Sequence, residues 1–175
     1  MRGSRAAGWQ RGPVPDASDA PQWFAGRLPA EWFDGPAEVT VDRDEIVVVG
    51  TLPGTGESAA QGEGHAARFR EETRPQRMRI ADEAQARYER TVSWGVAVGD
   101  DRILFTHQAV PVMTRLRQPE RRVLDTLVDA GVARSRADAL AWCVRLVGEH
   151  TDEWLTKLRE AMTTVDDLRA EGPGL

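Results

Sequence analysis

The chain of 175 residues contains a single cysteine, Cys143, and this scarcity excludes an internal disulfide bond. One thiol suits a reducing compartment. The longest apolar runs are too short to cross a membrane, and the first twenty residues lack the apolar stretch of a secretory signal. These absences favour a cytoplasmic protein that does not associate with membranes.

Lysine is also nearly absent, since the 23 basic residues include only Lys157. Such a bias usually reflects a GC-rich genome, so the number of arginines is weak evidence for phosphate binding. The net charge of −5 argues against a protein that coats nucleic acid. The charge is uneven, because residues 31–65 carry −7 whereas residues 112–150 carry seven arginines and five acids, a net +2. The sequence therefore allows a local basic face within an acidic protein.

No catalytic or metal-binding signature appears. His65, His107 and His150 are scattered and lack the spacing of metal ligands. Cys143 lies in a strongly apolar stretch, where a thiol is more often a small buried hydrophobe than a nucleophile. Nucleophile-elbow, zinc and dinucleotide-binding motifs are missing. We therefore expect no enzymatic activity, no metal and no cofactor.

The first 108 residues predict a tail followed by a small α+β domain. Residues 1–20 are rich in Gly, Ala, Pro, Ser and Asp and are expected to be disordered. Residues 38–52 and 91–107 have the two-residue period and turn residues of β-hairpins, and Ile46–Val49 is continuous enough to be buried on both faces. Between them, residues 53–64 predict a flexible loop. Residues 65–90 predict a helix that Pro75 either kinks or divides. The predicted order over residues 21–108 is β-β-α-β-β.

Two aromatic pairs, Trp23-Phe24 and Trp32-Phe33, precede these strands. They either fasten a short segment onto the core or form an exposed peptide that binds a partner. We favour packing on the core, because aromatic side chains carry a large apolar surface.

The last third of the chain predicts helices separated by a turn at Gly131. Apolar residues recur at helical spacing before that glycine and again up to Val147, and Ser135 and Asp138 have the spacing of a helix cap. The second helix is apolar around more than the single face that a surface helix needs. Either the first domain or a second copy of the chain would cover the extra surface. A further stripe predicts an amphipathic helix over residues 151–171.

The segment "PVMTRLRQP" before these helices can form a short strand. Its two faces are Val112, Thr114 and Leu116 on one side and Met113, Arg115 and Arg117 on the other. A shift of one residue in the strand register would exchange these faces. Strand, helix, turn and Ser-capped helix, with "SRADAL" at the cap, resemble the ribbon-helix-helix family of CopG, Arc and MetJ over residues 109–150. The sequence thus predicts an α+β protein: the β-β-α-β-β domain, a ribbon-helix-helix-like unit and a C-terminal amphipathic helix.

The resemblance implies a homodimer whose paired strands enter the major groove of double-stranded DNA. Met113, Arg115 and Arg117 would then read base edges, because the arginine fork pairs with guanine. The backbone around Ser135 and Arg136 would hold a phosphate at the start of the second helix. The implied function is a DNA-binding transcriptional regulator.

Two alternatives remain open. Arg115 and Arg117 could be solvated surface charges, and the unit could serve only to dimerise a non-catalytic adaptor. Such an adaptor would hold a protein partner through the aromatic segment or the last helix. The whole chain, with "VDRDEIVVVGTL" and "VSWGV" as landmarks, also resembles uncharacterised proteins of high-GC Gram-positive bacteria. That likeness implies no activity.

Overall fold

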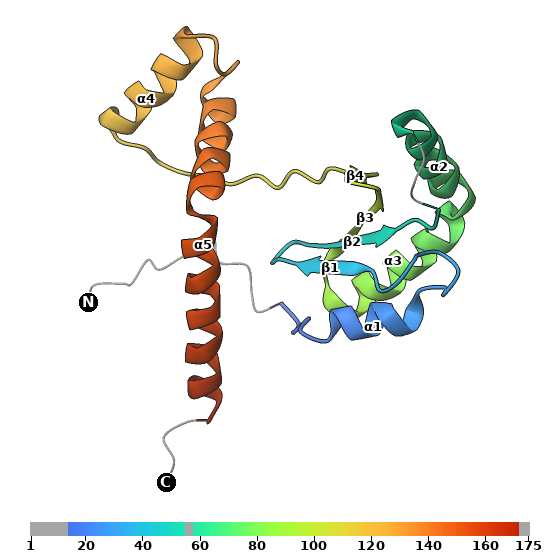
Figure 1. The fold of residues 1–175 in the computed structure, drawn as a ribbon. Coiled ribbons are helices and arrows are strands. Elements are labelled where there is room, and N and C mark those ends of the chain that lie inside the picture. Colours follow the sequence, from blue (N-terminus) through green and yellow to red (C-terminus); the bar gives the residue numbers. More distant parts are fainter. Residues whose placement is uncertain (1–13, 55–57, 172–175) are drawn as a thin grey trace. The chain divides into compact units, whose positions relative to one another are not determined.

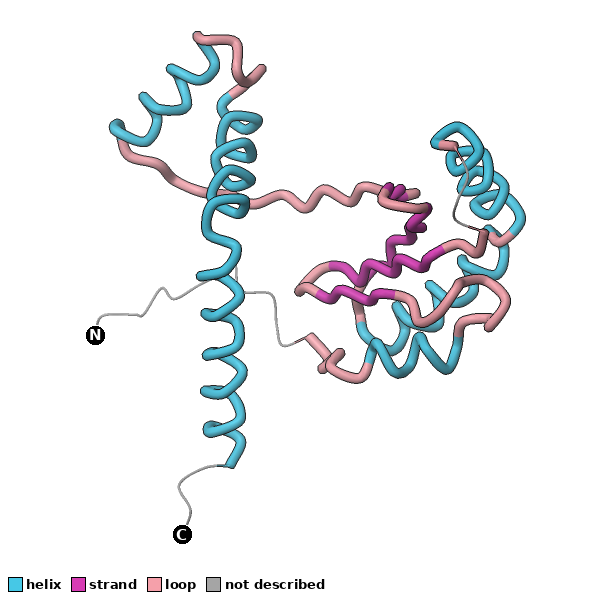
Figure 2. The backbone as a smooth tube through the Cα atoms, viewed as in Figure 1, coloured by secondary structure: helices cyan, strands magenta, loops and turns pink. Residues whose placement is uncertain are grey.

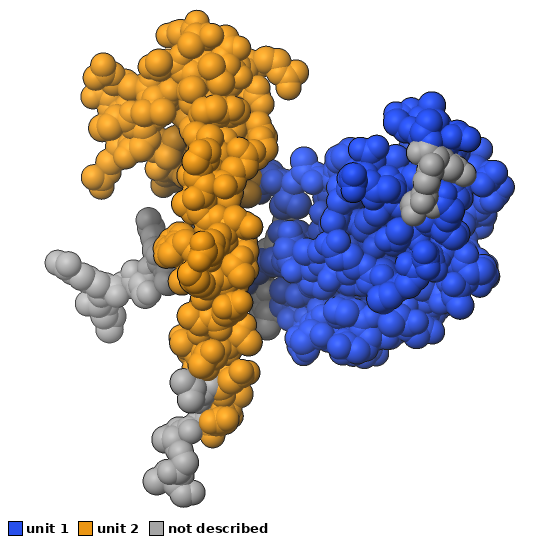
Figure 3. All heavy atoms as spheres, viewed as in Figure 1, with its two compact units in different colours: residues 1–111 blue, residues 112–175 orange. Residues whose placement is uncertain are grey.

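A computed structural model describes residues 14–54 and 58–171. The protein is mixed α+β, with a four-stranded sheet in its N-terminal half followed by helices (Figure 1). The chain divides into two compact units, residues 1–111 and residues 112–175 (Figure 3). The predicted α+β class is confirmed.

Two β-hairpins share one sheet in the first unit (Figure 2). Strands β1 (Glu38–Val41) and β2 (Glu45–Thr51) pair antiparallel, as do β3 (Thr91–Val98) and β4 (Asp101–Leu104). The sheet order is β1-β2-β3-β4, and the central pair, β2 and β3, is parallel. Parallel neighbours need a long crossover, which helices α2 (Ala59–Glu72) and α3 (Arg74–Tyr88) supply. The strands and the intervening helical segment follow the predicted order.

The crossover is broken at Thr73, between α2 and α3. Thr73 Oγ1 donates a hydrogen bond to the Phe69 carbonyl at 2.6 Å at the end of α2. Pro75 lies in the first turn of α3, where its missing N–H costs no helical hydrogen bond. Pro75 therefore starts a second helix rather than bending a single one.

The main core lies between one face of the sheet and the helices. Its buried members include Ile46 and Val48 of β2, Trp94 and Val96 of β3, and Phe24, Ile80, Ala84 and Tyr88 of the helices. Val49 points to the opposite face from Val48, and it is only 4% exposed. Burial on both faces, as expected of the continuous apolar run, is therefore confirmed at Val48 and Val49, whereas Val47 is half-buried.

The aromatic segment belongs to this core. Helix α1 (Ala20–Arg27), which the sequence patterns do not predict, buries Phe24 completely, and Trp32 is 7% exposed. Both rings meet Trp94 edge-on, at centroid distances of 6.2 Å and 6.3 Å. The pairs therefore fasten the segment to the core. The alternative of an exposed docking peptide is wrong for Phe24 and Trp32.

The expectation of a disordered tail over residues 1–20 is wrong for residues 14–20; residues 1–13 lie outside the described residues. Ala17 and Ala20 are buried, and Arg90 Nη1 donates to the Pro15 carbonyl at 2.8 Å. Small side chains and a backbone carbonyl make these contacts, so composition gives no sign of them.

The expectation of a flexible loop over residues 53–64 is wrong for residues 59–64, which form the start of α2. Ser58 and Gln61 form a capping box, with Gln61 N donating to Ser58 Oγ and Ser58 N donating to Gln61 Oε1. A Cβ on Gly62 would lie 2.8 Å from Val98 Cγ1. This glycine therefore permits close packing of α2 on β3. Residues 55–57 lie outside the described residues.

The second unit contains α4 (Gln118–Asp129) and α5 (Arg136–Glu171). Gly131 has φ +74° and follows α4, and Val132 N donates to the Leu127 carbonyl at 2.9 Å, as expected of a glycine helix stop. Ser135 Oγ accepts from Asp138 N at 3.2 Å, which confirms the predicted cap of α5. Thr151 is non-helical and divides α5 close to the predicted start of the last helix at residue 151.

The strand expected over residues 112–117 is absent from the single chain. Residues 109–117 have no regular secondary structure and follow a loop trace in Figure 2. A strand needs a hydrogen-bonded neighbour, and the described residues of one chain offer none at this segment.

Gly50→Ala is expected to destabilise the first unit by about 1–3 kcal/mol, because the core cannot absorb the added methyl without strain. The new Cβ would lie 2.2 Å from ring atoms of Phe33. Gly64→Ala on α2 is the control, since nothing lies within 4 Å of its Cβ. It should stabilise the unit by about 0.5–1 kcal/mol. Urea unfolding followed by tryptophan fluorescence measures the stability of both variants. An unchanged midpoint for Gly50→Ala would contradict the close packing of Phe33 on Gly50.

Candidate nucleic-acid interface

The described residues of the second unit enclose a small core. Leu124 of α4, Ala133 of the turn and Ala139 of α5 are buried. The half-buried residues packed against them are Leu116, Leu127, Val128, Leu140 and Cys143. This cluster holds α4, the turn, the first part of α5 and the end of the preceding segment together.

Leu116 anchors the segment of residues 112–117, which precedes α4, on the small core. Its side chain packs on the small core, whereas Met113 is 91% exposed and Arg115 and Arg117 are exposed. Val112 and Thr114 are exposed as well, so within residues 112–117 Leu116 is the side chain that packs on the core. Arg121 Nη1 donates to the Leu116 carbonyl at 2.7 Å and ties the segment to the first turn of α4.

Arg136 links α4 to α5. Its Nε and Nη2 donate to Asp125 Oδ1 and Oδ2 at 2.6 Å and 2.8 Å. This hydrogen bonding lowers the pKa of the Asp125 carboxyl and raises the pKa of Arg136. The Arg136 side chain is therefore engaged within the unit. The backbone N–H groups of Arg136 and Ala137, at the positive end of α5, have no acceptor within the described chain.

Four arginines gather at the start of α4: Arg115, Arg117, Arg121 and Arg122. In the described part of the chain, none of them forms an ion pair. Sequence reasoning did not select Arg121 and Arg122, because arginines on an exposed helical turn are ordinarily solvated. The hydrogen bond from Arg121 to the Leu116 carbonyl links this turn of α4 to the segment that carries Arg115 and Arg117.

Much of the apolar surface of the second unit is uncovered. Val144 and Val147 follow Leu140 and Cys143 by one helical turn, yet they are 64% and 54% exposed. The large apolar side chains exposed on this unit are Val112, Met113, Val123, Val132, Val144, Leu146, Val147, Trp154, Leu158, Met162 and Val165. Exposed apolar surface of this extent is uncommon on monomeric soluble proteins.

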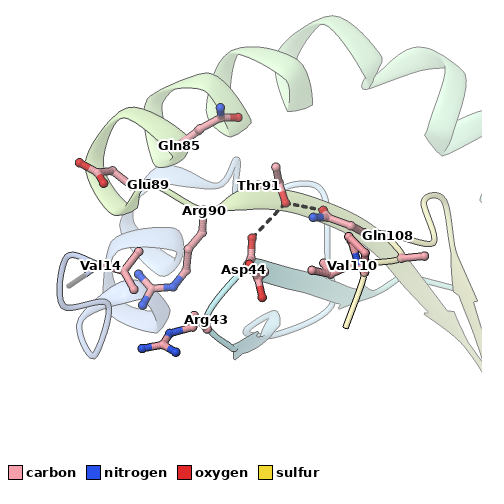
Figure 4. Close-up of a pocket in the computed structure, with 11 residues that line it drawn as sticks. Val14, Arg43, Asp44, Gln85, Glu89, Arg90, Thr91, Gln108 and Val110 are labelled. Carbon is pink, nitrogen blue, oxygen red and sulfur yellow. Dashed lines mark hydrogen bonds between the residues drawn. The ribbon is translucent and has the colours of Figure 1, made fainter. Parts of the chain in front are cut away.

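A cavity of about 680 Å³ lies in the first unit, between the β1–β2 turn, the end of α3 and residues 108–111 (Figure 4). Arg90, beside it, donates to three backbone carbonyls at 2.7–3.0 Å. Thr91 Oγ1 donates to the Asp44 carbonyl at 3.2 Å and contacts Gln108. Much of the polar lining is thus engaged by the protein itself.

Among the described residues, no three His, Cys, Asp or Glu side chains gather closely enough to hold a metal ion. None of the described helices is sufficiently long and apolar to cross a membrane. Cys143 is half-buried in the small core of the second unit.

These features define an α+β domain followed by a helical unit, and the chain belongs to the family of Rv1265-like proteins. Residues 18–104 match the family "Rv1265-like protein, N-terminal domain", and residues 117–169 match "Mb1296 C-terminal domain", so each match lies within one unit. The proteins Mb1296 of Mycobacterium bovis and Rv1265 of Mycobacterium tuberculosis are each 69% identical to the chain over 178 residues, covering 99% of the chain and 79% of the relative. No solved structure matches the chain. Neither family description names a ribbon-helix-helix protein.

Ser135→Ala is expected to destabilise the second unit by about 0.5–2 kcal/mol, the usual cost of losing a helix cap. Ser135→Asp is the control, because a carboxylate also accepts from the Asp138 N–H and favours the positive end of the helix. Thermal unfolding followed by circular dichroism compares the two. An equal loss of thermal stability in the Ser135→Ala and Ser135→Asp variants would contradict a capping role for Ser135.

Proposed function

We propose that this protein is a DNA-binding regulator that dimerises through its second unit in the manner of a ribbon-helix-helix protein. One observation carries the proposal: the segment before α4 packs Leu116 on the small core and leaves Arg115 and Arg117 exposed, in a unit with much uncovered apolar surface.

The dimer is supported by the imbalance between buried and exposed apolar residues. Three buried side chains, two of them alanines, are too few to stabilise an isolated unit of this size. A second copy would cover Val144 and Val147, which continue the stripe of Leu140 and Cys143 beyond the contact with α4. It would also give residues 112–117 a symmetry-related strand to pair with.

DNA binding is supported by the chemistry of the outward face. Arg115 and Arg117 form no ion pair among the described residues and can present planar forks to guanine. Arg121 and Arg122 lie one turn further on, within reach of a phosphate backbone. The N–H groups of Arg136 and Ala137 offer a second phosphate contact at the start of α5.

Val144→Asp is expected to convert the dimer into a monomer. In a single chain Val144 is 64% exposed, so the substitution costs little there; in the dimer it buries an unpaired carboxylate. Light scattering coupled to gel filtration should give twice the 19.4 kDa chain mass for the wild type and the chain mass for the variant. Met78→Asp is the control, because Met78 is 50% exposed on the first unit. A monomeric wild type would overturn the dimer.

Genomic DNA fragments selected by the purified protein should contain a pair of similar half-sites, because a symmetric dimer reads a symmetric site. The double variant Arg115→Ala/Arg117→Ala should lose site-specific binding while remaining dimeric, since each arginine–guanine contact contributes about 1–3 kcal/mol. Affinity of the wild type should fall steeply as salt rises, because phosphate contacts release counterions.

The matched control for this experiment is Arg68→Ala/Arg79→Ala. It removes the same charge from exposed positions on α2 and α3 of the first unit. Equal binding by the two double variants, or no enriched sequence at any salt concentration, would refute DNA reading by residues 115 and 117.

A second candidate function is a dimeric adaptor, and a specific observation favours it. Trp154, Leu158 and Met162 expose an apolar face on the second half of α5, which lies beyond the ribbon-helix-helix-like unit. An intact dimer that selects no DNA would support this candidate.

A further inference from the structure

The core of the first unit contains a buried guanidinium without a counter-ion. Arg77 of α3 is 5% exposed, and no carboxylate within the described residues pairs with it. Its Nε donates to Thr73 Oγ1 at 2.9 Å and its Nη2 donates to the Arg70 carbonyl at 2.6 Å. The indole N–H of Trp94, whose ring lies 6.0 Å from this guanidinium, is also buried and has no acceptor in the described chain. This part of the core therefore has more donors and more positive charge than it has acceptors.

Two exposed arginines add to that charge. Arg70 and Arg74 lie near Arg77, and burial together with these two charges lowers the pKa of Arg77 to about 10. Neither of them makes an ion pair among the described residues. The guanidinium carbons of Arg77 and Arg70 lie 4.9 Å and 5.7 Å from the centroid of the Phe105 ring. Two guanidinium cations therefore lie close to the ring of Phe105.

A cavity of about 370 Å³ opens beside this ring, between α2 and the end of β4. Its apolar lining is Ala66, Ala67, Ile103, Leu104 and Phe105. Arg70 and Arg74 line it as well, together with Glu63 and Glu71, and no ion pair joins these arginines to these carboxylates among the described residues. The cavity thus combines an apolar floor with two guanidinium groups and two carboxylates, and these four groups form no ion pair among the described residues.

We propose that this cavity binds a small aromatic carboxylate, with its ring against Phe105 and its acid group between Arg70 and Arg74. Planar guanidinium groups hold a carboxylate through paired hydrogen bonds. The apolar floor suits a flat hydrocarbon ring. Arg77 does not line the cavity, and its charge, 4.9 Å from the Phe105 centroid, would favour an anion there without touching it. The proposal concerns the first unit and is independent of DNA binding.

Titration of 2-naphthoate into the full ¹⁵N-labelled chain tests the site. The amide signals of Ala66, Ala67 and Leu104 should shift with saturation, because these residues line the cavity. The double variant Arg70→Gln/Arg74→Gln should bind about tenfold more weakly or worse, since two charge-assisted contacts are lost. Arg68→Gln/Arg79→Gln removes the same charge from exposed positions of α2 and α3 and should bind like the wild type.

The uncharged analogue 2-naphthamide, titrated into the wild-type chain, separates charge recognition from apolar binding without any substitution. Weaker binding of the amide supports the proposal. Equal binding of acid and amide, shifts elsewhere than the cavity, equal losses in the two double variants, or no binding of 2-naphthoate would each overturn it.

Discussion

The parallel pairing of β2 with β3 is the constraint on which the first unit depends. Seven residue pairs, from Glu45↔Thr91 to Thr51↔Ala97, place the two strands side by side in the same direction. No tight turn can join them, so the chain must cross the sheet, and α2 and α3 bury the apolar face on the way. The same crossover brings Arg70 and Arg77 over Phe105, which follows the edge strand. The core and the arginine-lined cavity thus arise from one topological requirement.

The second unit differs from the first. Its turns and helix caps are well specified by nearby residues, but its core is small. Gly131 ends α4, Ser135 caps α5, and the Arg136–Asp125 pair joins the two helices. These contacts are local and need no partner. They nevertheless leave Val144 and Val147 exposed, and burial of apolar surface supplies much of the free energy of folding. We therefore regard association as the step that would complete this unit.

Local patterns predicted those elements whose signals lie within a few residues. Both hairpins have alternating valines and turn residues, and the stop at Gly131 and the cap at Ser135 depend on backbone geometry nearby. The start of α2 was missed because Gly62 suggests a loop, whereas its purpose, contact with Val98, appears only when the sheet is formed. The cavity beside Phe105 could not be predicted for the same reason, since its residues meet through the crossover. The strand before α4 could not be tested by one chain, because its hydrogen-bond partner would belong to another.

The two groups of unpaired arginines have different surroundings, and this difference bears on what they can bind. Residues 112–150 carry a net +2 within a chain of net −5, and charges farther apart than about 8 Å are largely screened at physiological salt. Local charge, rather than the acidic total, would therefore govern the attraction of DNA that we propose for the second unit. Arg115 and Arg117 are exposed and would release counterions on binding a polyanion, so salt should oppose that association strongly. Arg70 and Arg74 border an apolar floor, where burial of a ring supplies part of the affinity and salt opposes only the charged part. Under the two proposals the same residue type would serve two kinds of recognition, and the apolar surface beside it would decide which.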